Sequence, residues 1–301
     1  MKKHCLSLLI FLSVIVVFSN AFPQLKKRVA VFTFEDKTDK SWRWWDGRSP
    51  GNGMADMLTT DLVKSGKYVV IERTEIAKVI EEQKLGQVGL VSEQSAVQMG
   101  QLLGVELAVM GAVTEFGFTT GGTGTRIGGI NVGVKSQSAT VAVDVRFVNT
   151  TTGEILAADH VRKEESSGGL RISTPEFGFN NRTDFDNSLV GKATRGAIDD
   201  MIILIEKQME QLPWEGKVIL VRDSSVYIKP GSDAGVQVGD TFVIYSKGEE
   251  LIDPDTGISL GSVETKVGTV EITSIVSGGK AAVATINMGS GFKVGDLVRL
   301  Q

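Results

Sequence analysis

Cysteine and histidine are nearly absent from this chain. Of its 301 residues one is a cysteine, Cys5, and two are histidines, His4 and His160. If residues 1–21 are removed on export, no disulfide framework, thiol nucleophile or cysteine-ligated metal site remains. A histidine-rich metal site or a Ser-His-Asp triad would depend on His160 alone. We therefore expect that the protein is not an enzyme and that it has no metal site and no cofactor.

An excess of positive charge and long apolar runs are also missing. The formal net charge is −4, so nucleic acid is not an expected partner. Beyond the first 21 residues no apolar run approaches the roughly 18 residues of a membrane helix, so any crossing of a membrane would use β-strands. The glycines that begin at Gly122 lack the following Gly-Lys-Ser/Thr of a nucleotide loop. The chain thus offers no chemical energy source.

The first residues have the pattern of a signal peptide. Lys2 and Lys3 precede an apolar run over residues 6–18, and small residues follow up to Ala21. We expect cleavage after residue 21, and the alternative of a retained N-terminal anchor stays open. Cys5 precedes the apolar run, whereas a lipid-accepting cysteine would follow it.

Residues 22–212 have the alternating pattern of an α/β layer domain. Strands are predicted at residues 28–34, 68–72, 105–113, 141–147 and 154–161, and helices at residues 53–65, 74–85, 92–103 and 189–212. The chain ends in short β runs separated by glycine over residues 213–301, with an echo of Gly235-Val-Gln-Val-Gly-Asp in Gly291-Phe-Lys-Val-Gly-Asp. This pattern predicts a small β-barrel or roll, either for docking or as a structural appendage.

Two stretches interrupt the α/β pattern, one near residues 115–140 and one near residues 162–188. Their small side chains bury little area, so they need water, lipid or another copy of the chain around them. Each contains apolar residues at alternate positions, as strands facing lipid would. These are Phe116, Phe118, Ile130, Val132, Val134, Leu170, Ile172, Phe177 and Phe179. We expect two membrane β-hairpins, and two flexible surface loops are the alternative.

Several segments together resemble the curli secretion channel family (CsgG/HfaB-like). The matching runs are Val29-Ala-Val-Phe-Thr-Phe-Glu-Asp-Lys-Thr, Gly53-Met-Ala-Asp-Met-Leu, Val70-Ile-Glu-Arg, Leu103-Gly-Val, Gly111-Ala-Val-Thr-Glu and Val145-Arg-Phe-Val-Asn-Thr-Thr-Thr-Gly-Glu-Ile-Leu. The resemblance covers roughly residues 29–211. The C-terminal module is outside the curli pattern and looks somewhat like that of the flagellar T-ring protein FlgT.

The resemblance implies a fold and an assembly. A periplasmic, three-layer-like α/β domain would form a homo-oligomeric ring, and two hairpins per copy would join into one outer-membrane β-barrel in contact with lipid. The loop at residues 37–52 would narrow the ring. The family's curli member is a lipoprotein, whereas this chain has no cysteine after its apolar run.

Three of the four tryptophans, Trp42, Trp44 and Trp45, fall in that loop. Repeated around a ring, they would form a pore constriction that contacts an extended polypeptide. Alternatively, one or two of them fold back onto the domain or anchor it at a membrane surface.

We therefore expect an outer-membrane channel with a periplasmic domain for passive secretion of unfolded polypeptide, as in curli assembly. The resemblance leaves room for a periplasmic accessory protein as a further partner. The alternative is a soluble periplasmic interaction or scaffold protein of the cell envelope.

Overall fold

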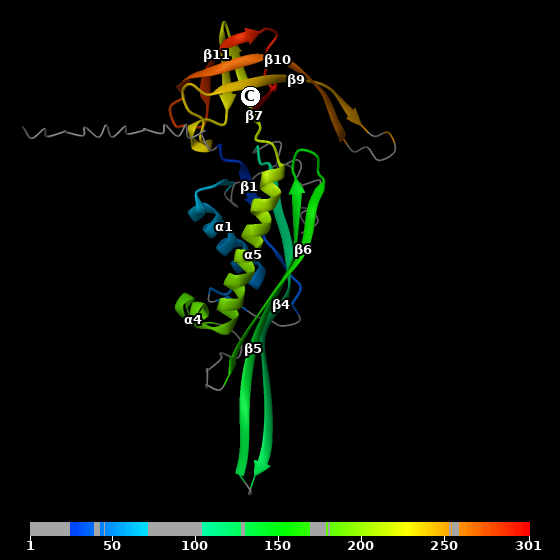
Figure 1. Cartoon of the computed structure of the whole chain (residues 1–301), viewed down its shortest axis with the longest axis vertical. Helices are drawn as coiled ribbons and strands as arrows, with labels where there is room; N and C mark the ends of the chain where they lie inside the picture. The colour runs from blue at the N-terminus through cyan, green and yellow to red at the C-terminus, as the bar shows by residue number, and fades with distance from the viewer. Residues whose placement is uncertain are drawn as a thin grey trace, which may run out of the picture.

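The computed structural model describes residues 25–38, 43–44, 46–71, 104–127, 130–168, 179, 181–252, 254 and 259–301. Within them the fold is mixed α+β, with one open sheet and one closed barrel. Figure 1 shows the barrel at one end of the molecule and a long β-ribbon at the other. The expected signal peptide at residues 1–21 and the expected helices at residues 74–85 and 92–103 lie outside the described residues.

The open sheet has the strand order β3-β1-β4-β5-β6. Its strands are β1 (Arg28–Val31), β3 (Val69–Ile71), β4 (Leu107–Ile127), β5 (Ile130–Asn149) and β6 (Ile155–Gly168), and β2 (Glu35–Asp36) pairs with β4. The pairs β1–β3 and β1–β4 are parallel, as expected when helices connect strands, and β4, β5 and β6 form an antiparallel meander.

Helix α1 (Pro50–Ser65) begins at a capped proline. The Ser49 side chain accepts a hydrogen bond from the Asn52 backbone N–H, and proline suits the first helical position because its missing donor would have no partner there. The helix ends at Gly66, whose φ of 65° is the left-handed conformation that glycine adopts readily. The helix predicted for residues 53–65 therefore begins three residues earlier than expected, at Pro50.

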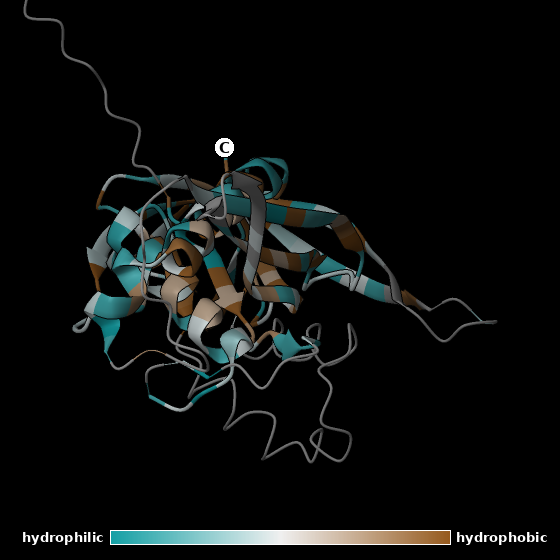
Figure 2. Ribbon diagram, turned by 90° about the horizontal axis from the view of Figure 1, so that it is seen from below, coloured by the Kyte–Doolittle hydropathy of each residue, from teal (hydrophilic) through white to brown (hydrophobic). Residues whose placement is uncertain are grey.

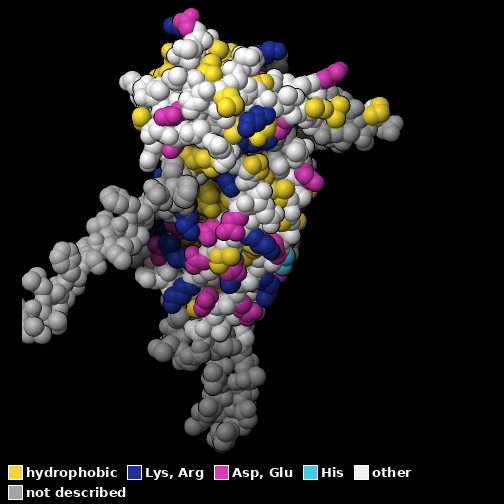
Figure 3. All heavy atoms as spheres, turned by 45° about the horizontal axis from the view of Figure 1, so that its top comes forward, with side chains coloured by type: hydrophobic (Ala, Val, Ile, Leu, Met, Phe, Trp, Pro, Cys, Tyr) yellow, Lys and Arg dark blue, Asp and Glu magenta, His cyan; other side chains and the backbone are white. Residues whose placement is uncertain are grey.

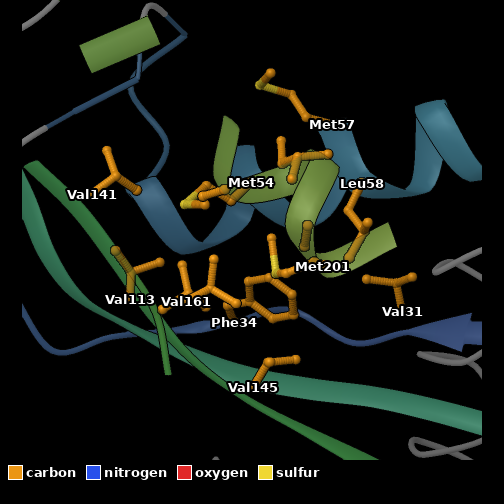
Figure 4. Packing of buried hydrophobic residues seen from close by; sticks show 14 of the residues in the cluster. Val31, Phe34, Met54, Met57, Leu58, Val113, Val141, Val145, Val161 and Met201 are labelled. Carbon is orange, nitrogen blue, oxygen red and sulfur yellow. The ribbon is translucent and has the colours of Figure 1, made fainter. Parts of the chain in front are cut away.

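Helix α5 (Leu189–Gln211) packs with α1 against one face of the sheet. Its N-cap is Ser188, whose hydroxyl accepts a hydrogen bond from the Gly191 N–H at 2.9 Å. Figure 4 shows Met54 and Leu58 of α1, together with Met201 of α5, pointing toward Phe34 and the strands. In Figure 2 hydrophobic colouring is concentrated where the helices meet the sheet. This interface is the larger of the two main cores.

The C-terminal strands close into a barrel with the order β10-β11-β8-β7-β12-β9. They are β7 (Gly216–Arg222), β8 (Ser225–Lys229), β9 (Thr241–Ile252), β10 (Ser259–Ile275), β11 (Ala282–Gly289) and β12 (Leu297–Leu300), with a short 3-10 helix η1 (Ser232–Ala234). The barrel has its own core, in which Trp214 stacks on Phe242 with ring centroids 5.3 Å apart. Strands β9 and β10 are longer than the sequence pattern predicts, because they continue past the barrel wall as a two-stranded arm.

Candidate functional site

A long antiparallel ribbon formed by β4 and β5 is the most distinctive feature of the described chain. The two strands pair continuously from Leu107 and Asn149 to Ile127 and Ile130, with one irregularity between Val113 and Glu115. The third strand, β6, pairs with β5 only as far as Ser136 and Gly168. The glycine-rich segment is therefore a regular strand, and its outer part has a single partner strand.

The part of the ribbon that extends beyond the core matches the thickness of a bilayer. The last residue pair that contacts the core is Phe118 with Ala139. Residues 119–127 of β4 and residues 130–138 of β5, nine on each strand, extend beyond it. At about 3.3 Å per residue, this part of each strand is roughly 30 Å long. Tilted by about 40°, as strands of membrane barrels are, it would cover about 23 Å, close to the apolar band of roughly 25 Å.

The register sorts the outer ribbon positions into two different faces, because alternate residues of a strand belong to opposite faces. One face takes Ile130, Val132 and Val134, opposite Ile127, Thr125 and Thr123. The other face takes Asn131, Gly133 and Lys135, opposite Arg126, Gly124 and Gly122. Both charged residues of the outer ribbon are thus on one face, and its β-branched apolar positions are on the other.

Phe116 and Phe118 do not share the face of Ile130, Val132 and Val134. Phe116 is only 5% exposed and belongs to the core of the α/β domain, and Phe118 packs against the same core. Before the irregularity that follows Val113, the odd-numbered residues of β4 face the core. The irregularity shifts the alternation by one residue, so the even-numbered residues face the core after it. The expectation that these two phenylalanines belong to a lipid-facing hairpin surface is wrong.

The segment of the second predicted hairpin, near residues 162–188, begins as a strand, and the hairpin itself stays a prediction. Its first arm is the end of β6, while Leu170, Ile172 and Phe177 lie outside the described residues. The end of the segment is not a strand. Residues there form helix α4 (Arg182–Asn187), because the Asn181 side chain caps it by accepting the Asp184 N–H at 2.9 Å.

Phe179 is in the core rather than on a membrane surface. It is 6% exposed and makes an edge contact with Phe185 of α4, with ring centroids 4.9 Å apart. Phe185 is itself fully buried. The alternation of Phe177 and Phe179 therefore does not describe a lipid-facing strand at Phe179, and the correction follows from the helix that comes directly after it.

The loop before α1 is held to the domain by Trp44. The indole is 3% exposed and lies 4.5 Å from the Phe185 ring and 6.0 Å from the Phe116 ring, measured between centroids. A Cβ at Gly53 would lie 2.3 Å from the indole, so the ring is packed directly on α1. Trp44 thus does not line an opening in this chain, and the alternative that it folds back onto the domain applies to it. Trp42 and Trp45 lie outside the described residues.

A charged surface pocket lies above Trp44. Arg48 forms ion pairs with Asp46 and Asp56, its Nε donating to Asp46 Oδ2 at 2.8 Å. This hydrogen bond lowers the pKa of Asp46 and raises that of Arg48. Arg182 of α4 and Arg195 of α5 also line this pocket. No local sequence pattern indicates these two arginines, because only the tertiary fold brings α4 and α5 beside α1.

The described residues show no metal-ligating constellation and no membrane helix. No group of three or more His, Cys, Asp or Glu side chains is arranged to hold a metal ion in this part of the chain. Among the same residues no helix is long and apolar enough to cross a bilayer. His160 is exposed on the sheet, where its Nδ1 lies 2.6 Å from Asp144 Oδ1.

Sequence comparison confirms the family resemblance. The family described as curli production assembly/transport component CsgG matches residues 12–226 of this chain. The CsgG proteins of Salmonella typhimurium and Escherichia coli K12 are each 29% identical over 173 residues, which is 56% of this chain and 59% of theirs. The chain thus matches about three fifths of the length of these relatives. The family match ends early in the barrel, whose likeness to FlgT stays a prediction.

Solved structures resemble the fold only distantly. One is the hypothetical protein CT253 from Chlamydia trachomatis, with a TM-score of 0.39 and 15% identity, covering 60% of this chain and 96% of that one.

Proposed function

The chain belongs to the CsgG family of curli production assembly/transport components, and from this premise we propose that it is an outer-membrane, homo-oligomeric channel for passive secretion of unfolded polypeptide. In this proposal the α/β domain lies in the periplasm. The ribbons of several copies join into one barrel in contact with lipid. The cargo is a secreted polypeptide.

The observation that carries the proposal is the geometry of the outer ribbon. Nine residues of each strand extend past the core. The register places Arg126 and Lys135 on one face of the ribbon, and Ile130, Val132 and Val134 on the other. A wall between lipid and water requires this separation, with one face apolar and the other polar.

The open edges of the ribbon support assembly from several copies. Beyond Ser136 neither β4 nor β5 has a further partner strand among the described residues. In a bilayer each unpaired backbone group would cost several kcal/mol, so a two-stranded ribbon is stable there only when neighbouring ribbons close a barrel. Each copy would add these strands and those of a second hairpin that begins with the end of β6.

The loop before α1 is the proposed constriction, but its three tryptophans have different roles. Trp44 fixes the loop to the domain through Phe116 and Phe185. Trp42 and Trp45 remain the proposed aromatic contacts for passing polypeptide. We propose no catalytic role, since the name of the family describes transport and assembly and the sequence offers no nucleotide loop.

Extraction and imaging test the proposal. The full-length chain, extracted from outer membranes in mild detergent, should appear by electron microscopy as rings with one central pore. A variant that lacks residues 118–135 should leave the membrane fraction and fail to form a barrel. A deletion in the barrel turn at residues 277–279 serves as the control and should leave membrane association intact. Wild-type monomers in the soluble periplasmic fraction would contradict the channel and favour a soluble scaffold protein.

A further inference from the structure

The C-terminal barrel carries a second projecting ribbon, which we name the arm. It consists of residues 246–252 of β9 and residues 259–265 of β10, paired only with each other. Figure 1 shows it extending away from the barrel wall. At about 3.3 Å per residue, seven residues reach roughly 23 Å. An isolated two-stranded ribbon is marginally stable in water, so an arm of this length needs a surface to rest on.

The arm is both apolar and acidic. Leu251 is 50% exposed and Val263 is 63% exposed, and Figure 3 shows hydrophobic side chains gathered on the projection. Residues 246–265 contain one lysine and five carboxylates, a net charge of −4, whereas the rest of residues 214–301 has a net charge of +1. The acidic charge of the barrel domain is therefore concentrated on the arm and the residues that connect its two strands. A surface that receives it should be basic.

The barrel has such a basic surface on β7 and β8. Lys217 and Lys229 are directly opposite each other in the ladder, an arrangement that like charges destabilise. Within the described part of the chain no carboxylate forms an ion pair with either lysine. Burial, Lys217 and Arg28 all lower the pKa of Lys229. We name Lys217 and Lys229 the lysine pair.

Nearby acids do not neutralise the lysine pair. Glu215 is bound by Arg299, which also binds Glu264 at the base of the arm. Burial raises the pKa of Glu106 to about 8, so this carboxyl is mostly uncharged at neutral pH. An external carboxylate at the lysine pair would relieve the repulsion between the two ammonium groups.

The arm and the lysine pair are on opposite sides of the barrel and at the same level. In the closed order β10-β11-β8-β7-β12-β9, the β7–β8 pair is diametrically opposite the β9–β10 pair. Lys217 pairs with Leu297, which pairs with Tyr245, the residue just before the arm. An arm cannot reach the lysine pair of its own barrel. It is placed to reach that of a neighbour in a ring.

We propose that the arm of each copy docks on the lysine pair of the next copy, with Glu249 against Lys217 and Lys229. Donor and acceptor are different surfaces, so the contact is heterologous and repeats head to tail until a ring closes. The occupant of the β7–β8 surface is therefore a second copy of this chain. The inference rests on the proposed ring and assigns to the barrel the task of linking its subunits.

Cysteine cross-linking tests the contact directly. In a Cys5→Ser background, the full-length chain with both Leu251→Cys and Tyr227→Cys should give, on oxidation in membranes, a ladder of covalent multimers up to the ring size. Leu251→Cys alone should give dimers at most. The pair Leu251→Cys and Lys280→Cys is the matched control and should give no ladder, because Lys280 lies in the turn between β10 and β11.

Charge reversal gives a second, independent readout. Glu249→Lys should lower the fraction of ring particles in detergent about tenfold, because like charges then face each other across the contact. Lys217→Glu with Lys229→Glu should do the same, and these two changes together with Glu249→Lys should restore assembly to within about twofold. Lys280→Glu, with unchanged circular dichroism, should leave assembly as in the wild type.

The outcomes separate the inference from the channel proposal. Rings that form in every reversal variant, with no cross-linked ladder, would overturn the docking of the arm and leave the channel in place. A wild-type chain that is monomeric in membranes would overturn both. Loss of rings in the Glu249→Lys variant and in the double lysine variant, without recovery in the triple variant, would also overturn the pairing of these charges.

Discussion

Trp44 and Gly53 form a contact that a double-mutant cycle can measure. The indole is buried between Phe116 and Phe185, and a Cβ at position 53 would lie 2.3 Å from its ring atoms. No real Cβ tolerates that distance, so in the wild type either the ring or the helix would have to move when alanine replaces Gly53. The perturbations are Trp44→Ala, Gly53→Ala and the two together.

The expected energies follow from packing. Trp44→Ala removes a buried aromatic side chain and should lower the free energy of unfolding by about 3 to 5 kcal/mol. Gly53→Ala overpacks the contact and should cost about 1 to 2 kcal/mol in the wild type. Without the indole, the same change should stabilise α1 by up to about 1 kcal/mol, since alanine favours helix over glycine. The coupling between the two sites is therefore about 2 to 3 kcal/mol.

Urea unfolding in detergent, followed by circular dichroism at the helical minimum, measures this coupling. The signal reports on the α/β domain, because the described α-helices all belong to it. Tryptophan fluorescence would change with the substitution itself and is not suitable. An equal cost of Gly53→Ala in both backgrounds would refute the packing of Trp44 on α1. If Trp44→Ala left the free energy of unfolding unchanged but altered the conductance of the pore, Trp44 would line the constriction instead of packing on α1.

Three further predictions concern other residues. Burial raises the pKa of Glu106 to about 8 from 4.5, so the folded state holds a proton that the unfolded state lacks between these values, and stability should fall as pH rises through this window. Glu106→Gln should flatten that fall in thermal unfolding and stabilise the chain at pH 9 by up to about 4 kcal/mol. Arg299→Met should cost about 1 to 3 kcal/mol, since Glu215 and Glu264 would lose their shared partner, and a further Glu264→Gln should recover part of the loss. Combined Trp42→Ala and Trp45→Ala should raise the conductance of the pore in planar bilayers, and unaltered conductance would remove them from the constriction.

Local sequence patterns predicted much of the α/β domain. The apolar period of residues 189–212 matches helix α5 within one residue, because its buried stripe is a property of the helix itself. The start of α1 was missed because Gly51 and Gly53 disfavour a helix locally. They are glycines because of the tertiary fold: a Cβ at position 51 would lie 2.1 Å from the Phe34 carbonyl oxygen.

The face of each strand residue was harder to predict than the strand itself. Alternation shows which residues share a face, but it does not show where a bulge reverses the sequence of faces. The irregularity after Val113 places Phe116 and Phe118 in the core, on the opposite face from Val132. The burial of Trp44 likewise depends on Phe185, which is 141 residues away in the sequence, and no local pattern reveals such a contact.

Accessibility of single cysteines along β5 tests the central claim most directly. In a Cys5→Ser background, residues 131–135 are replaced one at a time in intact outer membranes and treated with a charged, membrane-impermeant maleimide. The account predicts labelling at Asn131→Cys, Gly133→Cys and Lys135→Cys, and protection at Val132→Cys and Val134→Cys, with the opposite pattern for a lipid-soluble quencher. Uniform labelling at all five positions would contradict a lipid-facing ribbon.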